Sequence, residues 1–434
     1  MGLAKRTLVA GILSVLIAVA ASAENWPQWR GPAFNGSTTE TDLPTVFSKT
    51  DSVKWVVPMP GASGATPAVW GDRVFVSTVD EAAGRILALC IDARDGKVLW
   101  RKDVGRDRKV PRNNMASPSP IADGKAAYFS YGTGGVFAFD LGGSPLWSRD
   151  LEKDHGHNAV MFGYSSSPLL YKGRLYVVAI RNKQQNRYGQ APEGPSDSYL
   201  LAIDPQTGKD LWKQVRPTDA GDEAQEAYST ALPYEWNGRS EVLVYGADYL
   251  TGHDPATGKE LWRWSGYNPR HIAHWRIIAS PVVAGELVCV CGPKHSRLFA
   301  VRPEGAGALG EDRVAWTFDR LFPDAGTPLY YKDRLYVLDD DARVMTCFDP
   351  KTGARKWQLE IGGEFVMRAS PLGADGKVYC VNDMGEVTVL AAGDEPKVLH
   401  RTAMGERELC RSSIVAAGGR LYVRTSTHLY CIGK

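Results

Sequence analysis

Short runs of alternating apolar and polar residues cover the chain from about residue 53 to its last residues. Turns that carry glycine or proline separate them, as at Lys172–Gly173, which follows one apolar run and precedes another. A period of two residues, interrupted by tight-turn residues, is typical of antiparallel β-hairpins rather than of helices. The pattern therefore predicts a chain built of many short strands.

One turn phrase recurs with fixed spacing and groups the strands into units. An aspartate precedes a tryptophan by eight residues and a glycine precedes it by four, in the copies Asp92–Trp100, Asp204–Trp212, Asp254–Trp262 and Asp349–Trp357. Weaker copies end at Trp55, Trp147 and Trp316, and a degenerate copy ends at His400. The gaps between these positions run from 41 to 65 residues, which suits a four-stranded propeller blade.

The last unit, which starts at Ser413, has only three strand signals, and the segment Val53–Val57 can supply the fourth. Pairing the two ends of the chain removes an exposed sheet edge. We therefore predict an all-β fold: an eight-bladed β-propeller of four-stranded antiparallel blades over residues 53–434. An N-terminal strand completes the last blade, and an extension precedes it over residues 24–52.

The first 23 residues have the composition of a secretory leader. Lys5 and Arg6 form a basic start, Leu8 to Ala21 an apolar run, and Ala21-Ser-Ala23 a small-residue cleavage site. As a helix, the apolar run spans about 21 Å, less than the roughly 30 Å of a bilayer's hydrocarbon layer. No cysteine lies near the cleavage site. We therefore expect a cleaved signal peptide, no transmembrane segment in the mature form, and a periplasmic or secreted protein.

The mature chain is formally neutral. The whole chain has 51 basic and 49 acidic residues, and the leader removes two basic ones, so 49 remain against 49. A neutral balance argues against nucleic acid as the main partner. A protein or a polysaccharide of the cell envelope remains as a partner, and we expect a monomer.

Cysteines and aspartates give no defined metal site. Seven cysteines is an odd number, so at least one thiol is unpaired in a monomer. Cys90, Cys347 and Cys431 occupy the small-residue slot of the repeat, which predicts buried core residues; a structural disulfide is the alternative. Asp339–Asp341 suggests calcium, but its place at a hairpin tip favours a solvated turn. We predict no metal site.

The best candidate for a functional surface is the loop that joins Trp262 to Ser280. Segments that lead into the inner strands of a propeller line one face around the central channel. Arginines, histidines and aromatic residues there suit an anionic or planar ligand; the alternative is that they plug the channel or cap the loops. The ligand-binding candidates are His271, His274, Trp275, Arg276, Arg368, Arg411, Tyr164 and Tyr228.

The repeated phrase, Ala-x-Asp-x-x-Thr-Gly-Lys-x-x-Trp, resembles the tryptophan-docking motif of the pyrroloquinoline-quinone (PQQ) repeat propellers, the quinoprotein alcohol dehydrogenase-like superfamily. The resemblance extends from about Lys54 to the C-terminus. It implies that each motif tryptophan packs against the neighbouring blade and ties the ring together. The docking residues that it implies are Trp55, Trp100, Trp147, Trp212, Trp262, Trp316 and Trp357.

That family contains PQQ-dependent dehydrogenases and the cofactor-free outer-membrane assembly factor BamB. The segment Trp26–Pro32 also resembles a third group, secreted bacterial PQQ-like propellers of unassigned function. The dehydrogenases carry two adjacent cysteines beneath the quinone, and this chain has no such pair. We therefore expect a non-catalytic, BamB-like binding or scaffold module with no cofactor and no catalytic residue. The alternative is a PQQ- and calcium-dependent dehydrogenase of alcohols or sugars.

Overall fold

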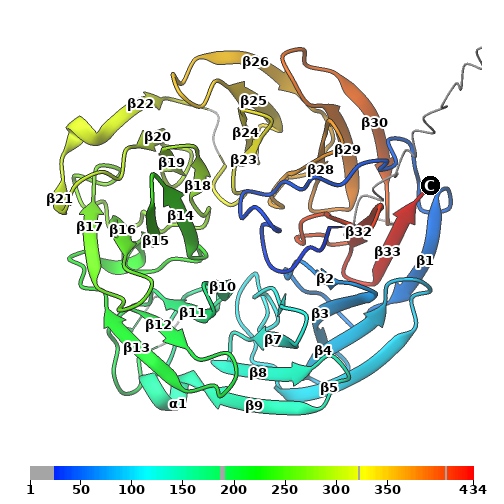
Figure 1. Cartoon of the computed structure of the whole chain (residues 1–434), viewed down its shortest axis with the longest axis horizontal. Coiled ribbons are helices and arrows are strands. Elements are labelled where there is room, and N and C mark those ends of the chain that lie inside the picture. The colour runs from blue at the N-terminus through cyan, green and yellow to red at the C-terminus, as the bar shows by residue number, and fades with distance from the viewer. Residues whose placement is uncertain (1–23, 186–190, 321–322, 406–407) are drawn as a thin grey trace, which may run out of the picture.

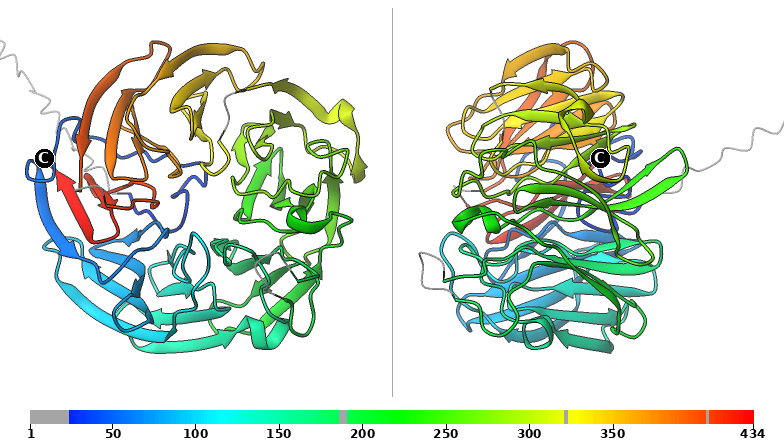
Figure 2. Two further views of the ribbon diagram at one scale, coloured as in Figure 1. Left: turned by 180° about the vertical axis from the view of Figure 1, so that it is seen from behind. Right: turned by 90° about the vertical axis from the view of Figure 1, so that its left-hand side faces the viewer.

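The computed structural model describes residues 24–185, 191–320, 323–405 and 408–434. Eight sheets stand around a central axis (Figure 1) and form a thick disc when seen from the side (Figure 2). The prediction of an all-β, eight-bladed propeller is confirmed. The predicted leader lies outside the described residues, and within them no helix has the length and apolar character needed to cross a bilayer.

Each of the first four blades consists of four consecutive strands, ordered from the channel outward. They are β2 (Ala68–Trp70), β3 (Arg73–Asp80), β4 (Arg85–Asp92) and β5 (Val98–Arg106); β6 (Ile121–Ala122), β7 (Ala126–Ser130), β8 (Gly135–Asp140) and β9 (Pro145–Asp150); β10 (Leu169–Tyr171), β11 (Arg174–Ala179), β12 (Tyr199–Ile203) and β13 (Asp210–Val215); and β14 (Leu232–Trp236), β15 (Arg239–Gly246), β16 (Tyr249–His253) and β17 (Glu260–Trp264). A short helix, α1 (Leu151–His155), follows β9.

The last four blades follow the same order. They are β18 (Val282–Ala284), β19 (Leu287–Cys291), β20 (Leu298–Val301) and β22 (Val314–Phe318); β23 (Leu329–Tyr331), β24 (Arg334–Asp339), β25 (Val344–Phe348) and β26 (Arg355–Glu360); β27 (Leu372–Ala374), β28 (Lys377–Val381), β29 (Glu386–Ala391) and β30 (Val398–Ala403); and β31 (Val415–Ala417), β32 (Arg420–Arg424), β33 (His428–Gly433) and β1 (Val53–Pro58). Two 3₁₀ turns, Asp222–Gln225 and Glu311–Arg313, lie between strands.

The ring closes through a strand from the other end of the chain. β1 pairs antiparallel with β33, so that Trp55 faces Cys431 and Val57 faces Leu429. Figure 1 shows these strands, in blue and red, side by side. The pairing gives the last blade its fourth strand, which confirms the prediction made from Val53–Val57.

The repeated tryptophans contact the blade that follows them. Trp100 stands opposite the small residue Cys90, and its indole N–H donates to the carbonyl of Leu141 in the next blade at 3.2 Å. A Cβ on Gly143 would lie 2.7 Å from that indole, so this turn needs a glycine. Equivalent N–H to carbonyl contacts join Trp55 to Ala93, Trp147 to Pro205, Trp316 to Pro350 and Trp357 to Gly393.

Trp262 departs from this pattern. Its N–H donates to Glu241 Oε2 of its own blade at 2.6 Å. Its strand also pairs in parallel with an additional short strand, β21 (Gly307–Leu309), which comes from the next blade. That blade has Arg302 where five other blades have the turn aspartate, as at Asp254. An added strand therefore covers Trp262 where a glycine turn covers the other tryptophans.

Two predictions about buried groups have different outcomes. Cys90, Cys347 and Cys431, which we predicted to be core residues, are buried and form no disulfide, and the same is true of the other four cysteines. Asp339, Asp340 and Asp341 lie where β24 leads into β25, at the predicted hairpin tip. The prediction of a solvated turn is wrong, because Asp339 and Asp340 are only 4% and 2% exposed. A loop of the preceding blade that carries His295 covers them, and only Asp341 faces solvent.

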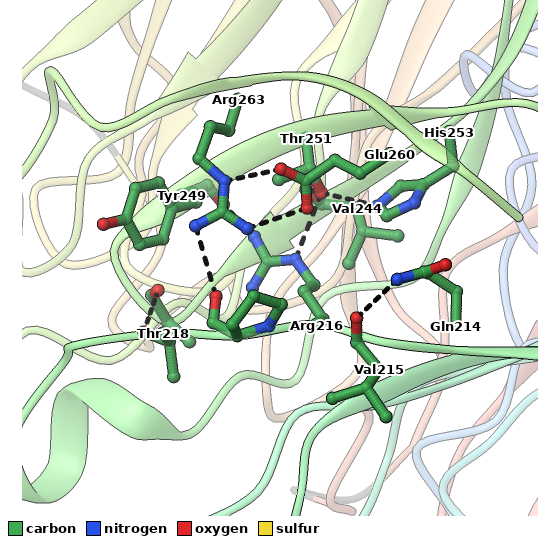
Figure 3. Close-up of polar contacts among 12 residues, drawn as sticks. Gln214, Val215, Arg216, Thr218, Val244, Tyr249, Thr251, His253, Glu260 and Arg263 are labelled. Atoms are coloured by element: carbon green, nitrogen blue, oxygen red, sulfur yellow. Dashed lines mark hydrogen bonds and ion pairs between the residues drawn. The ribbon is translucent and has the colours of Figure 1, made fainter. Parts of the chain in front are cut away.

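A buried arginine joins the third blade to the fourth (Figure 3). Arg216 donates to two backbone carbonyls of the β15–β16 turn and to the hydroxyl of Thr251. That hydroxyl lies 2.9 Å from His253 Nε2, and His253 Nδ1 lies 3.0 Å from the carbonyl of Gly258. Burial lowers the pKa of His253 to about 4. The imidazole is therefore neutral, with Nδ1–H donating to Gly258 and Nε2 accepting from Thr251.

Candidate functional site

A closed ring of hydroxyl groups surrounds the axis where the inner strands begin. One serine or threonine from each blade donates its backbone N–H to the hydroxyl of the equivalent residue in the next blade, at 2.8 to 3.3 Å. The last of these bonds returns from Ser413 to Thr66 and completes the circle. The ring consists of Thr66, Ser119, Ser167, Thr230, Ser280, Thr327, Ser370 and Ser413.

These eight residues, which we call the hydroxyl ring, keep unused donors. All are less than 9% exposed, and each hydroxyl oxygen accepts one amide. Within the described ranges, none of the eight O–H groups donates to a protein acceptor. A buried hydroxyl without an acceptor is unfavourable, so these protons need water or a ligand in the channel.

The extension before β1 closes one end of this channel. The side-chain amide of Gln28 bonds the backbone of Leu170 in the third blade. Arg30, which is 2% exposed, donates to the carbonyls of Pro328 and Pro371 in the sixth and seventh blades at 2.7 and 3.1 Å. The third blade lies across the ring from the sixth and seventh blades, so the segment that carries Gln28 and Arg30 has to pass across the axis. Figure 1 shows this crossing segment in dark blue.

The closed channel forms a cavity of about 600 Å³, which we call the cup. Trp29, between Gln28 and Arg30 in the crossing segment, lies at its closed end. The hydroxyl ring surrounds the cup above Trp29. Residues that precede the ring residues along the chain line the mouth of the cup. The charged and aromatic side chains at the mouth are Arg112, Phe162, Tyr228, Arg276, Asp324, Arg368 and Arg411.

Arg276 is held at the mouth by two carboxylates. Its guanidinium donates to Glu223 Oε1 at 3.0 Å and to Asp324 Oδ2 at 3.1 Å, and it lies 5.5 Å from the ring centre of Phe162. The side chains of Arg276 and Glu223 are only 11% and 4% exposed. Because this ion pair is largely buried, Arg276 is fixed in place and stabilises the loops of two neighbouring blades.

Arg368 and Arg411 share one carboxylate. Arg368 donates to Asp383 Oδ2, and Arg411 Nε lies 3.7 Å from the same oxygen. Arg411 also donates to the backbone carbonyl of Arg112. The exposed guanidinium of Arg112 lies 5.5 Å from the ring of Phe162 and forms no ion pair within the described ranges. The mouth thus gathers four guanidinium groups, three of which face carboxylates, and the Lys294 ammonium also lies 3.8 Å from Glu223 Oε1.

The structure gathers half of the candidates predicted from sequence. Arg276, Arg368, Arg411 and Tyr228 line the cup together. The hydroxyl of Tyr228 donates to Glu226 Oε2 at 3.1 Å, and burial raises the pKa of Tyr228 well above its ordinary value.

The other four candidates lie elsewhere. The side chain of Tyr164 points between two blades rather than toward the axis. It is therefore only 4% exposed, and its hydroxyl donates to the carbonyl of Val178 in β11. His271 Nδ1 lies 2.9 Å from the buried Asp248 Oδ2, outside the cup. His274 is exposed, and Trp275 lines a separate pocket of about 230 Å³.

The sequence did not predict that Trp29, Arg112, Phe162 and the hydroxyl ring would line one site. A usable signal existed for the ring, since a serine or threonine precedes a proline at the start of most inner strands, as in Thr66-Pro67. No comparable local signal marks Trp29 or Arg112, because the long extension and an irregular loop carry them to the axis.

Comparison with known proteins assigns this chain to a family. A family model described as outer membrane protein assembly factor BamB matches residues 36–194, 163–306 and 304–432. The BamB crystal structure from Moraxella catarrhalis has a TM-score of 0.60 at 13% identity and covers 88% of this chain and 97% of its own. A europium-containing methanol dehydrogenase has a TM-score of 0.71 at 9% identity, covering 95% and 98%. At these identities the structural likeness shows the fold alone.

Sequence relatives point to quinone enzymes over part of the chain. A polyvinylalcohol dehydrogenase of Pseudomonas sp is 28% identical over 181 residues, 41% of this chain and 26% of the relative. A quinohemoprotein alcohol dehydrogenase of Pseudomonas putida is 30% identical over 190 residues, 36% and 26% respectively. The matched part thus spans about a quarter of these relatives. Because the family model spans nearly the whole propeller, the chain belongs to the BamB-type family of PQQ-like repeat propellers.

Proposed function

We propose that this protein is a non-catalytic binding module of the cell envelope that holds a small anionic ligand in its cup. The observation that carries the proposal is the convergence of four arginines and eight unused hydroxyl donors on one cavity closed at its far end. The BamB family match supports a place in the envelope. A protein or polysaccharide that carries the anionic group would be the partner.

The groups at the cup suit an anion for electrostatic and geometric reasons. Guanidinium and hydroxyl groups donate hydrogen bonds, and a donor that meets an ionised acceptor forms a bond about twice as strong as a neutral one. Arg112 has no carboxylate partner within the described ranges, so a ligand carboxylate or phosphate can pair with it without displacing one. Trp29 and Phe162 add aromatic surface for a planar or ring-shaped body.

Paired titrations of the mature protein test this proposal. Isothermal titration with glucuronate and with glucose compares an anion with its neutral analogue, and we expect measurable binding of glucuronate alone. Arg112→Gln should weaken that binding about tenfold, the value of one charge-assisted hydrogen bond. Arg270→Gln is the matched control, because Arg270 is exposed and lines the separate pocket beside Trp275. Equal behaviour of the two sugars, or of the two variants, contradicts an anion-binding cup.

The second candidate is a PQQ- and calcium-dependent dehydrogenase of alcohols or sugars, which the names of the sequence relatives favour. The cup fits part of that requirement, because Arg112, Arg368 and Arg411 suit the carboxylates of a planar quinone. It does not fit the calcium. Calcium takes six to eight oxygen ligands, and the three carboxylates at the mouth, Glu223, Asp324 and Asp383, are already paired with guanidinium groups.

The two candidates are separated by titration with PQQ, with and without Ca²⁺, followed by dye reduction over alcohols and aldoses. The binding module predicts no dye reduction, and any PQQ binding should be independent of Ca²⁺. Calcium-dependent quinone binding with substrate-dependent dye reduction would establish the dehydrogenase instead.

A further inference from the structure

Two turns from neighbouring blades meet beside the mouth of the cup and place three aspartates around one histidine. In the sixth blade, Asp339 ends β24, and Asp340 and Asp341 begin the turn that leads to β25. The β19–β20 turn of the fifth blade carries His295. His295 also lines a cavity of about 330 Å³ that shares Arg276 with the cup.

The histidine ring faces carboxylates with both nitrogens. Its Nδ1 lies 3.7 Å from Asp339 Oδ2 and 3.7 Å from Asp340 Oδ1, and its Nε2 lies 3.3 Å from Asp341 Oδ2. A direct N–H···O bond has a length of about 2.7 to 3.2 Å. Nδ1 is therefore too far from both buried oxygens for a good hydrogen bond, yet the three atoms lie close enough together to share one ion.

The hydrogen bonds of the two buried carboxylates leave one oxygen atom, Asp339 Oδ2, without a donor within the described ranges. Asp339 Oδ1 accepts the backbone N–H of Ala342 at 2.7 Å, whereas its Oδ2, on a residue only 4% exposed, has no hydrogen bond within the described ranges and is directed at His295. Asp340 accepts the backbone N–H groups of Asp324 and Ala325 at 3.1 to 3.2 Å.

We propose that Asp339 Oδ2, Asp340 Oδ1 and His295 Nδ1 bind a divalent transition-metal cation, with Zn²⁺ or Mn²⁺ as the fitting ions. Ligand atoms about 2.1 Å from one such ion lie roughly 3.0 to 3.4 Å apart. The two distances of 3.7 Å from Nδ1 therefore need to shorten by only a few tenths of an ångström, and the three atoms all lie within 4.8 Å of one another. The mixed nitrogen and oxygen donors suit these ions, whereas Ca²⁺ needs more oxygens than this site supplies.

Asp341 is the positioning residue of this site. A histidine that ligates a metal through one nitrogen usually donates its other N–H to a carboxylate, which fixes the ring and its tautomer. Asp341 Oδ2 holds that place relative to Nε2 at 3.3 Å. The three aspartates of the turn thus divide into two ligands and one support, which a solvated turn does not require.

The second histidine–carboxylate group of the described chain lacks this geometry. Asp219, Asp248 and His271 also lie within reach of one ion. There, however, His271 Nδ1 is 2.9 Å from Asp248 Oδ2, a normal hydrogen-bond distance that leaves no room for a cation between them. Asp248 Oδ1 also accepts from Asn268 at 2.6 Å, so both oxygens of this carboxylate already have hydrogen-bond partners.

Titration of the mature, EDTA-treated protein with Zn²⁺, Mn²⁺ and Ca²⁺ tests the proposal. We expect one equivalent of Zn²⁺ or Mn²⁺ to bind, and Ca²⁺ to bind more weakly. His295→Gln should reduce the affinity at least tenfold, and Asp341→Ala about 10- to 100-fold, the usual effect of removing a supporting carboxylate. His274→Gln, which changes an exposed histidine outside the group, is the matched control.

The outcome does not depend on the ligand of the cup, because the probe is the metal alone. Circular dichroism verifies that each variant is folded, which the partial exposure of His295 and Asp341 favours. Absence of Zn²⁺ and Mn²⁺ binding at millimolar concentration overturns the proposal. So does binding that His295→Gln leaves unchanged, or tighter binding of Ca²⁺ than of either transition ion.

Discussion

His253 should make the fourth blade sensitive to acid. Its imidazole is 0% exposed, and burial lowers its pKa from 6.5 to about 4 in the folded protein. Between these two pH values the unfolded chain binds a proton that the folded chain does not bind. The free energy of unfolding therefore falls as the pH drops from about 6.5 to 4, and His253 contributes no change above pH 7.

The magnitude follows from the two pKa values. At pH 4.5 the difference in proton binding amounts to about 2.5 kcal/mol relative to pH 7.5, since each unit of pKa corresponds to about 1.4 kcal/mol. Protonation would also place a second positive charge near Arg216 and would end the acceptance of the Thr251 hydroxyl by His253 Nε2, leaving that hydroxyl only the Val244 carbonyl at 3.2 Å. Both of these structural effects also lower the free energy of unfolding at acid pH.

Urea unfolding followed by tryptophan fluorescence measures this effect at pH 7.5, 6.5, 5.5 and 4.5. The comparison variant is His253→Ile, because Ile91 and Ile203 occupy the same slot in two other blades. Buried carboxylates with raised pKa values, such as Asp340 and Glu226, act in the opposite direction, but they cancel when the two proteins are subtracted. A difference between the proteins that stays constant within about 0.5 kcal/mol from pH 7.5 to 4.5 refutes the reasoning.

Three further predictions concern the ring and its closure. Gly143→Ala should lower the free energy of unfolding by about 2–4 kcal/mol, because Gly143 has φ +91° and an added Cβ would lie 2.7 Å from the indole of Trp100. The control is Gly173→Ala, at φ +71° with nothing within 4 Å, which should cost only about 1 kcal/mol. Equal losses for the two variants in chemical denaturation would contradict the docking of Trp100 against this turn. Arg30→Ala should cost about 2–4 kcal/mol, since three carbonyls lose their donor, and an unchanged melting temperature would show that the crossing segment does not tie the blades. Arg276→Ala should cost about 3 kcal/mol in urea unfolding, because it removes largely buried ion pairs with Glu223 and Asp324; Arg276→Lys should recover part of that loss.

The candidate site shows where sequence reasoning reached its limit. Arg276, Arg368 and Arg411 were found because each precedes the serine that opens an inner strand, a local and repeated position. Tyr164 holds a similar position, yet its side chain turns between the blades and bonds to β11. Position in the repeat places a residue near the axis, but the packing of the two adjoining blades decides the direction of its side chain.

The sequence by itself determined the number of blades, their strand order and the closure by Val53–Val57. These follow from spacings of eight and four residues and from alternation over single strands, because turns and hairpins are stabilised by contacts within one short segment.

Only the tertiary structure decided which residues meet. It brought Trp29 beneath the hydroxyl ring, buried Asp339 and Asp340 under a loop of another blade, and gave Trp262 a different cover from the other tryptophans. The physical reason is that the cup and the aspartate turn are assembled from segments far apart in the chain. Their burial and charge depend on which loops of different blades meet when the blades pack side by side, and no local pattern records those contacts.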